Sequence, residues 1–158
     1  MQSVNALLDV DVAELAVEAL RQGLRDLLVA VVLFGSRARG DALEASDWDM
    51  LVIAHDLPEK PLDRRFYLKE LVPESCRGAI SILARTPSEF RSQLPSLYLD
   101  IALDGCVLYD PTGYMSAELA ALRQLMRQVG LYREITSAGD NWRWQNEPVD
   151  DWRQAWHR

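Results

Sequence analysis

This sequence of 158 residues has no long uncharged apolar run, no cysteine cluster and no surplus of basic side chains. Without an apolar run of about 20 residues, we expect no membrane span and no membrane partner. The first residues, MQSVNALLDVDVAEL, contain no basic segment followed by an apolar one, which is the pattern of a secretory signal. We therefore predict a cytoplasmic protein.

The sequence contains only two cysteines, Cys76 and Cys106, and neither lies in a CxxC or Cys/His cluster. The usual zinc sites are thereby excluded. A disulfide would need an oxidising compartment, which nothing in the sequence suggests. Because apolar residues flank both cysteines, we expect two small buried thiols.

Acidic residues outnumber basic ones by 24 to 17, which gives a formal net charge of -7. This balance creates no overall field that attracts polyanions, so we do not expect nucleic acid as a partner or as an acceptor. Hydrophobic residues make up 49% and charged residues 26%, as in ordinary globular proteins. The length predicts about one domain.

Apolar periodicity predicts alternating helices and strands along the chain. An apolar stripe indicates a helix over 12–27, and continuous apolar runs indicate buried strands over 27–34 and 48–54. Further helices are expected over 62–72, after Thr86-Pro87, after Pro95 and over 114–129. Further strands are expected over 78–85 and 105–109.

The segment after Gly139 differs from the rest because it carries four of the five tryptophans: Trp142, Trp144, Trp152 and Trp156. The last two are four residues apart, which would put them on one face of a final helix. We expect residues 136–158 to form an extension that packs on the domain at 1–135 or on a partner. A homodimer contact and a ligand platform are the alternatives, because tryptophan is favoured in interfaces.

Two short segments combine a Gly-Ser turn, two arginines and a pair of acids. The first predicted buried strand ends in LFGSRARGD (33–41), and the second opens with SDWDM (46–50). Asp47 and Asp49 are two apart, so on a strand both carboxylates point to one face, while Trp48 and Met50 point to the other. Two such carboxylates repel each other unless a cation lies between them, and oxygen ligands suit Mg²⁺ together with substrate phosphates.

The Gly-Ser turn and the arginines provide features that bind phosphate. Gly35 allows close approach of the backbone to a ligand, and the N–H groups that begin at Ser36 would face a phosphate. Arg37 and Arg39 offer fork-shaped donors for phosphate oxygens; for one of them, a surface ion pair with a neighbouring acid is the alternative. A phosphate cradle beside a pair of metal-binding carboxylates indicates nucleotide chemistry.

At these residues the sequence resembles the nucleotidyltransferase superfamily that includes DNA polymerase beta, especially its minimal nucleotidyltransferases. The shared signature is a hydrophobic residue with Gly-Ser, a gap, and then Asp-hydrophobic-Asp-hydrophobic. Here it consists of Phe34-Gly35-Ser36, ten intervening residues and Asp47-Trp48-Asp49-Met50. The resemblance covers roughly residues 15–110. It implies an α/β (α+β) fold with a small mixed sheet flanked by helices.

The resemblance also implies roles for single residues. Asp47 and Asp49 would hold Mg²⁺ or Mn²⁺ and carry catalysis, and the residues that would bind ATP or another nucleoside triphosphate are Gly35, Ser36, Arg37 and Arg39. Catalytic members usually add a third carboxylate on the next strand, which helps to deprotonate the attacking hydroxyl. Here that position is Ser81, and no acid occurs from 78 to 85. Proton abstraction would then need another group, such as Asp63 or Asp100.

Two functions follow as hypotheses. The first is a Mg²⁺-dependent nucleotidyltransferase that moves AMP, or another nucleoside monophosphate, onto a hydroxyl of a protein or small molecule. The second, favoured by Ser81, is a catalytically weakened module that binds nucleotide or a partner, since members of the family often act as the antitoxin of a helical toxin. The aminoglycoside-modifying relatives are a third alternative, although they usually carry a longer helical domain.

Overall fold

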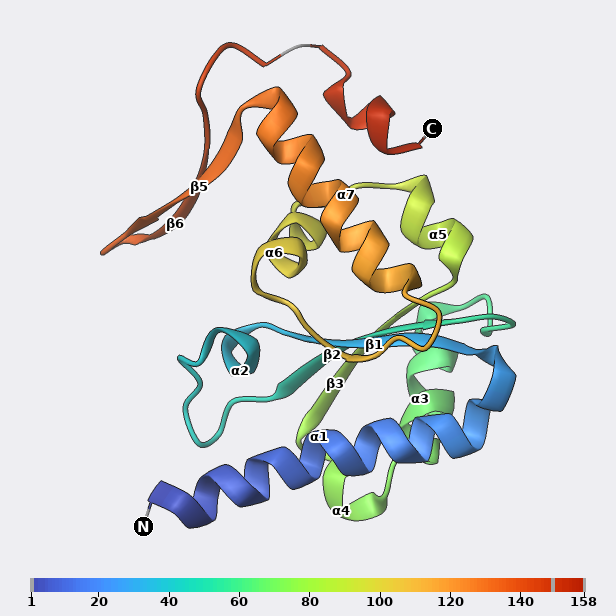
Figure 1. Cartoon of the computed structure of the whole chain (residues 1–158). Helices are drawn as coiled ribbons and strands as arrows, with labels where there is room; N and C mark the ends of the chain where they lie inside the picture. Colours follow the sequence, from blue (N-terminus) through green and yellow to red (C-terminus); the bar gives the residue numbers. More distant parts are fainter. Residues whose placement is uncertain (1, 149, 158) are drawn as a thin grey trace.

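A four-stranded mixed sheet lies at the centre of the molecule, whose computed structural model describes residues 2–148 and 150–157 (Figure 1). The strands are β1 (Leu28–Phe34), β2 (Trp48–Ala54), β3 (Ile80–Arg85) and β4 (Cys106–Tyr109), in the order β3-β2-β1-β4. β1 is antiparallel to β2 and β4, whereas β2 and β3 are parallel. The predicted small mixed sheet is confirmed.

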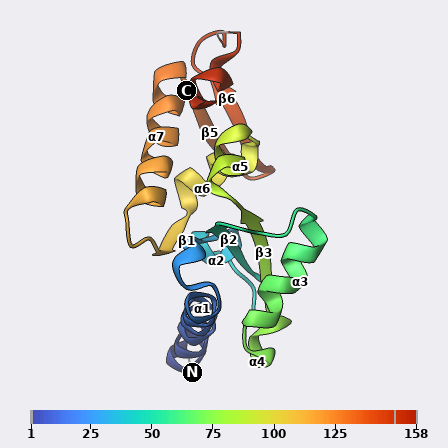
Figure 2. The ribbon, with the colours of Figure 1, turned by 90° about the vertical axis from the view of Figure 1, so that its right-hand side faces the viewer.

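Helices cover both faces of this sheet (Figures 1 and 2). Below it in Figure 1 lie α1 (Gln2–Leu24), α3 (Pro61–Leu71) and α4 (Glu74–Arg77); above it lie α5 (Pro87–Ser92), α6 (Ser96–Asp104) and α7 (Tyr114–Val129). Strand residues alternate between the two layers, with Val31 in the lower core and Val32 in the upper core. This double burial explains the continuous apolar runs of β1 and β2. α1 begins ten residues before the predicted start at 12 and leads into a short 3₁₀ turn, η1 (Arg25–Leu27).

The start of α5 follows the predicted helix signal. Thr86 Oγ1 accepts a hydrogen bond from the N–H of Glu89, whose carboxylate accepts one from the N–H of Thr86, so the two residues form a capping box. Arg64, which is almost fully buried, donates to both carboxylate oxygens of Glu89, at 2.8 and 3.1 Å. These hydrogen bonds lower the pKa of Glu89 to about 2. The upper layer is therefore joined to α3 at the end of β3.

The Trp-rich tail is present, but it begins with a hairpin that the sequence analysis did not predict. Its strands are β5 (Leu131–Thr136) and β6 (Gly139–Trp144), and a 3₁₀ helix, η2 (Trp152–His157), follows. The predicted boundary between residues 135 and 136 falls inside β5. Residues four apart in a 3₁₀ helix point in directions about 120° apart, so Trp152 contacts Trp144 and Trp156 contacts Phe90. The expectation that both tryptophans share one helix face is wrong.

The two cysteines lie in different environments. Cys76 is buried, as expected, but Cys106 is exposed on the edge strand β4, so the expectation of a buried thiol is wrong there. An edge strand has a neighbour on one side only, which leaves part of its side chains uncovered. In the portion of the chain that the structure describes, no helix is both long and apolar enough to span a bilayer.

Candidate active site

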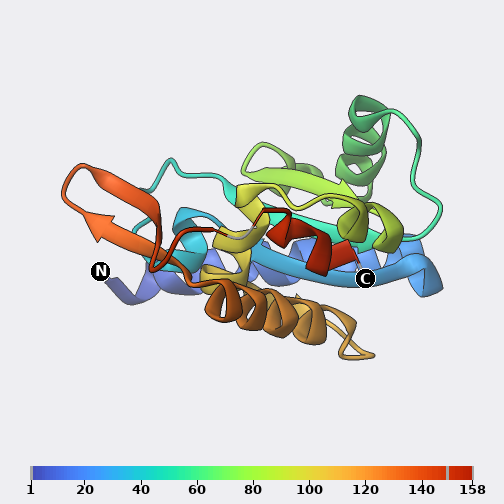
Figure 3. The ribbon, with the colours of Figure 1, turned by 90° about the horizontal axis from the view of Figure 1, so that it is seen from above.

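A cavity of about 520 Å³ opens above the sheet, where β1 ends. Its walls come from the turn into α2 (Ser36–Arg39), from β2, from α6 and from the hairpin β5–β6. Figures 1 and 3 show the hairpin extending over the end of the sheet that carries α2. The volume lies in the range of pockets that hold small molecules and cofactors. Three stretches that are distant in sequence, 34–49, 97–104 and 133–142, thus line one site.

Gly35 forms the sharp turn from β1 into α2. Its φ of 72° and ψ of -157° lie in a region that is open almost only to glycine. A Cβ atom at this position would collide with the carboxylate of Asp49. The carbonyl of Gly35 accepts hydrogen bonds from the N–H groups of Ala38 and Arg39, both at 3.1 Å. The turn therefore brings backbone against Asp49, whereas Ser36 is half-buried at the start of α2, outside the lining of the cavity.

The two acids of the motif lie at the start of β2. Asp49 is half-buried and lines the cavity, Asp47 is exposed immediately before the strand, and Trp48 and Met50 are buried on the opposite face, as predicted. Burial raises the pKa of Asp49 above its usual value, the charge of Asp47 raises it further, and Arg39 lowers it. On balance these influences disfavour the charged form of Asp49.

The oxygen ligands of Asp47 and Asp49 are of the kind that hard cations prefer. Across residues 2–148 and 150–157, no three His, Cys, Asp or Glu side chains gather closely enough to hold a metal ion on their own. Mg²⁺ commonly takes one or two protein carboxylates and completes its shell with water and substrate phosphates. Asp47 and Asp49 are the residues that would hold it.

Ser81 lies beside Asp49 in the sheet. The parallel pairing of β2 with β3 places Asp49 opposite Ser81, so both side chains point into the upper layer. The position at which the family resemblance implies a third carboxylate is therefore next to Asp49, but it carries a hydroxyl. Of the two alternative acids, Asp100 lines the cavity from α6, whereas Asp63 is exposed on α3, below the sheet.

The two arginines of α2 point in different directions. Arg37 donates to the carbonyl of Ser46 at 3.0 Å and to that of Glu44 at 3.2 Å, and its guanidinium lies 4.7 Å from the ring centre of Trp48. Arg39 lines the cavity and pairs with Asp41 at 3.3 Å. Arg37 thus holds the loop that leads to Asp47, while nucleotide binding by Arg37 and by Arg39 remains a prediction.

Sequence analysis missed Arg133 and the hairpin that close the cavity from above, although it named Trp142 among the tail tryptophans. Arg133, on β5, donates to both carboxylate oxygens of Asp104 at 2.6 and 2.7 Å and to Asp100 at 3.1 Å. These hydrogen bonds lower the pKa of Asp104 and raise that of Arg133. Trp142, on β6, lines the same cavity. The signal available in the sequence was two short stretches, LYREIT and GDNWRW, on either side of a Ser-Ala turn.

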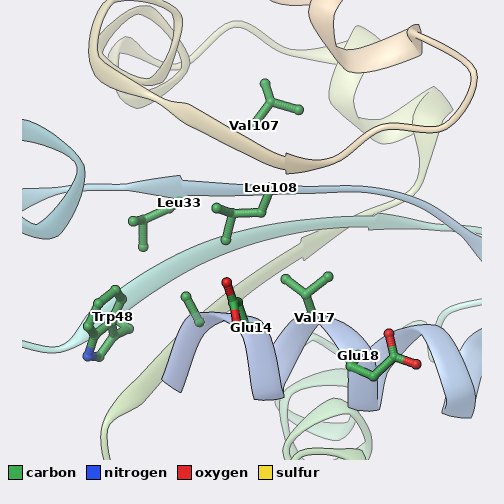
Figure 4. A pocket seen from close by; sticks show the side chains of 8 residues that line it. Glu14, Val17, Glu18, Leu33, Trp48, Val107 and Leu108 are labelled. Carbon is green, nitrogen blue, oxygen red and sulfur yellow. The ribbon is translucent and has the colours of Figure 1, made fainter. Parts of the chain in front are cut away.

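A larger cavity of about 680 Å³ lies below the sheet (Figure 4). Figure 4 shows Val17 of α1 facing Leu108 of β4, with Trp48 at one end. Its walls are mainly apolar, and the acids that line it are Glu14 and Glu18 of α1. Because Asp49 lies on the other face of the sheet, this cavity is separate from the candidate site.

Comparisons with known proteins agree with the fold and the motif. A Methanocaldococcus jannaschii protein, whose name proposes protein adenylyltransferase activity, is 48% identical over 54 residues, which are 34% of this chain and 37% of that protein. The matched stretch thus spans about a third of the curated relative. A solved toxin–antitoxin structure with AMP-PNP has a TM-score of 0.53 at 18% identity, over 72% of this chain and 86% of the other. A mutant of the toxin–antitoxin MntA–HpeT has a TM-score of 0.52 at 16% identity, over 71% and 85%.

A family model matches the central region of the chain. The model of the nucleotidyltransferase domain matches residues 16–101, more than half of the chain. This stretch includes the Gly35 turn and the acids of β2. The chain belongs to the nucleotidyltransferase domain family.

Proposed function

We propose that this protein transfers AMP from ATP to a hydroxyl group of a partner protein. The observation that carries the proposal is one cavity that brings together the Gly35 turn, the guanidinium of Arg39 and the half-buried carboxylate of Asp49. A triphosphate needs a close backbone approach and positive charge, and its metal ion needs oxygen ligands.

The reaction is a displacement at the α-phosphorus. The acceptor oxygen forms a bond to this phosphorus, the bond to the oxygen that bridges to the β-phosphate breaks, and pyrophosphate leaves while the hydroxyl proton passes to a base. Asp47 and Asp49 would hold Mg²⁺ or Mn²⁺, which when bound offsets the charge of the phosphates. Arg39 offers a second positive charge at the cavity. Catalysis of this kind rests mainly on positioning and charge stabilisation.

A protein hydroxyl is the acceptor that the comparisons favour. The relative from Methanocaldococcus jannaschii bears a name that proposes protein adenylyltransferase activity, and two structural neighbours are toxin–antitoxin pairs. The net charge of -7 also argues against a nucleic acid as acceptor. We propose a helical partner protein as the acceptor.

Ser81 favours a second candidate function, a module that binds nucleotide without transferring it. A serine hydroxyl opposite Asp49 neither accepts a proton near neutral pH nor adds charge for a second metal ion. Asp100 lines the cavity, but its carboxylate already accepts a hydrogen bond from Arg133 at 3.1 Å. The two functions share the nucleotide site and differ in whether a base completes it.

Incubation with α-labelled ATP, Mg²⁺ and cell extract distinguishes the two. Under the proposal, the wild-type protein labels an acceptor protein, and Asp49→Asn abolishes the labelling. Asp63→Asn is the matched control, because it removes an exposed acid below the sheet and should leave the labelling unchanged. Binding of Mg²⁺-ATP in calorimetry without labelling supports the second function. Absence of binding to the wild type contradicts both.

A further inference from the structure

We propose that the hairpin β5–β6 forms the nucleobase-binding wall of the cavity, with Trp142 stacking on the base. The inference rests on the proposed function, because it assumes that the cavity takes a nucleoside triphosphate. The hairpin lies outside residues 16–101, the part that the nucleotidyltransferase model matches. The wall would thus be a feature of this chain's extension and not of the matched domain.

The hairpin has two different faces. Arg133 pairs with Trp142 across the strands, and Leu131 pairs with Trp144, so these four side chains share one face. Leu131 is buried, and both tryptophans are half-buried against the upper core. On the other face, Tyr132 is 43% exposed. The hairpin therefore turns one specific side, including Trp142, towards α6 and the cavity.

Arg133 fixes this side in place. Its guanidinium is bound to two carboxylates of α6, those of Asp104 and Asp100, at distances between 2.6 and 3.1 Å. The side chain of Arg133 is only 11% exposed, and an arginine held by both oxygens of a carboxylate is restrained in direction as well as distance. Trp142, the cross-strand neighbour of Arg133, is held at the cavity by the same contact.

The lining of the cavity offers both charged and apolar side chains. Gly35, Arg39 and Asp49 line it from the end of the sheet, while α6 and the hairpin contribute Leu97, Ile101 and Trp142 beside the charged side chains of Asp100, Asp104, Arg133 and Asp140. With the triphosphate at the Arg39 and Asp49 side, the base has only the α6 and hairpin side to occupy. A tryptophan ring offers a flat apolar surface for any base, and such stacking contributes substantially to nucleotide affinity.

The test compares ATP with inorganic tripolyphosphate, which carries the phosphates but no base. Both are titrated calorimetrically with Mg²⁺ into the wild type and three variants. We expect Trp142→Ala to weaken ATP binding roughly 10- to 100-fold, the range of base–aromatic stacking, and to leave tripolyphosphate binding unchanged. Trp142→Phe, which keeps an aromatic ring, should retain most of the ATP affinity and covers the case in which the alanine variant does not fold.

Tyr132→Ala is the matched control, because it removes an aromatic ring from the opposite face of the same hairpin. It should bind both ligands as the wild type does. Equal ATP affinity in Trp142→Ala and the wild type overturns the inference, and so does a loss of the same size for tripolyphosphate. If the wild type binds neither ligand, the proposed function itself fails, whereas equal affinity of the wild type for both ligands refutes only the base wall.

Discussion

Replacement of Ser81 by aspartate tests whether the acids at the end of the sheet share a cation. Ser81 and Asp49 are partners on adjacent parallel strands, with side chains on the same face. Neighbouring strands lie about 4.8 Å apart, so the two carboxylates would be roughly 5 Å apart. At this distance two like charges repel by about 3 kcal/mol at an effective dielectric constant near 20 and by about 1 kcal/mol in water.

The expected loss of unfolding free energy at neutral pH lies between these limits, at about 2 kcal/mol without metal. Asp49 is half-buried, and its pKa is already raised by burial and by Asp47, so a third negative charge meets a site that is short of positive charge. A divalent cation that binds only the folded state should reverse the loss by mass action. The same variant should also gain transfer activity, because it acquires a general base.

Urea denaturation followed by tryptophan fluorescence, with either a chelator or Mg²⁺ present, measures this effect. Ser81→Asn is the control for shape, because it fills the same space without charge, and Mg²⁺ should stabilise it no more than it stabilises the wild type. The reasoning is refuted if Ser81→Asp loses the same stability with and without Mg²⁺. In that case Asp49 and residue 81 do not share a cation, and the metal site lies elsewhere.

Three further perturbations have expected outcomes. The pKa of Glu89 is about 2 in the folded protein against an ordinary 4.5, so its contribution to the unfolding free energy is complete above about pH 4.5 and is lost as the pH falls towards 2. Because the side chain is 42% exposed, we expect a loss of only about 1–2 kcal/mol in urea denaturation of the wild type, and none in Glu89→Gln. Arg133→Ala leaves the carboxylate of Asp104, which is 15% exposed, without its partner, so it should lower the unfolding free energy by about 2 kcal/mol and expose the hairpin to proteolysis. An unchanged cleavage pattern would contradict the anchoring role of Arg133. Arg39→Ala should weaken ATP binding about 10-fold with little loss of stability, whereas Arg37→Ala, which removes hydrogen bonds to two loop carbonyls, should cost about 1–2 kcal/mol of stability. The reverse pattern would mean that Arg37 binds the nucleotide and Arg39 holds the loop.

The central strands could be predicted because each one is a short, continuous stretch of apolar residues. Val31, Val32, Leu51 and Val52 are fully buried, two in each layer, and a strand covered on both faces has no polar positions to interrupt it. The start of α5 was equally local, since Thr86 and Glu89 form the capping box within four residues. In both cases the residues that determine the element lie inside it.

The upper wall of the cavity could not be predicted in this way. Arg133 meets Asp100 and Asp104 across 33 and 29 residues of chain, and no spacing rule connects such distant positions. The directions in which Arg37 and Arg39 point could not be predicted from the sequence either. Both belong to one four-residue helix, and their contacts depend on the loop that follows.

The two halves of the motif, Gly35 and Asp49, are in contact in the structure. The sequence presents them as separate halves, a turn after one strand and an acid in the next, fourteen residues apart. In the structure β1 and β2 are antiparallel neighbours, and Phe34 is the partner of Asp49, so the turn comes directly against the carboxylate. A side chain at position 35 would be strained by the positive φ and would also collide with the carboxylate of Asp49. The glycine is therefore required by the acid as much as by any phosphate, and the two halves form one structural unit that sets where the carboxylate lies.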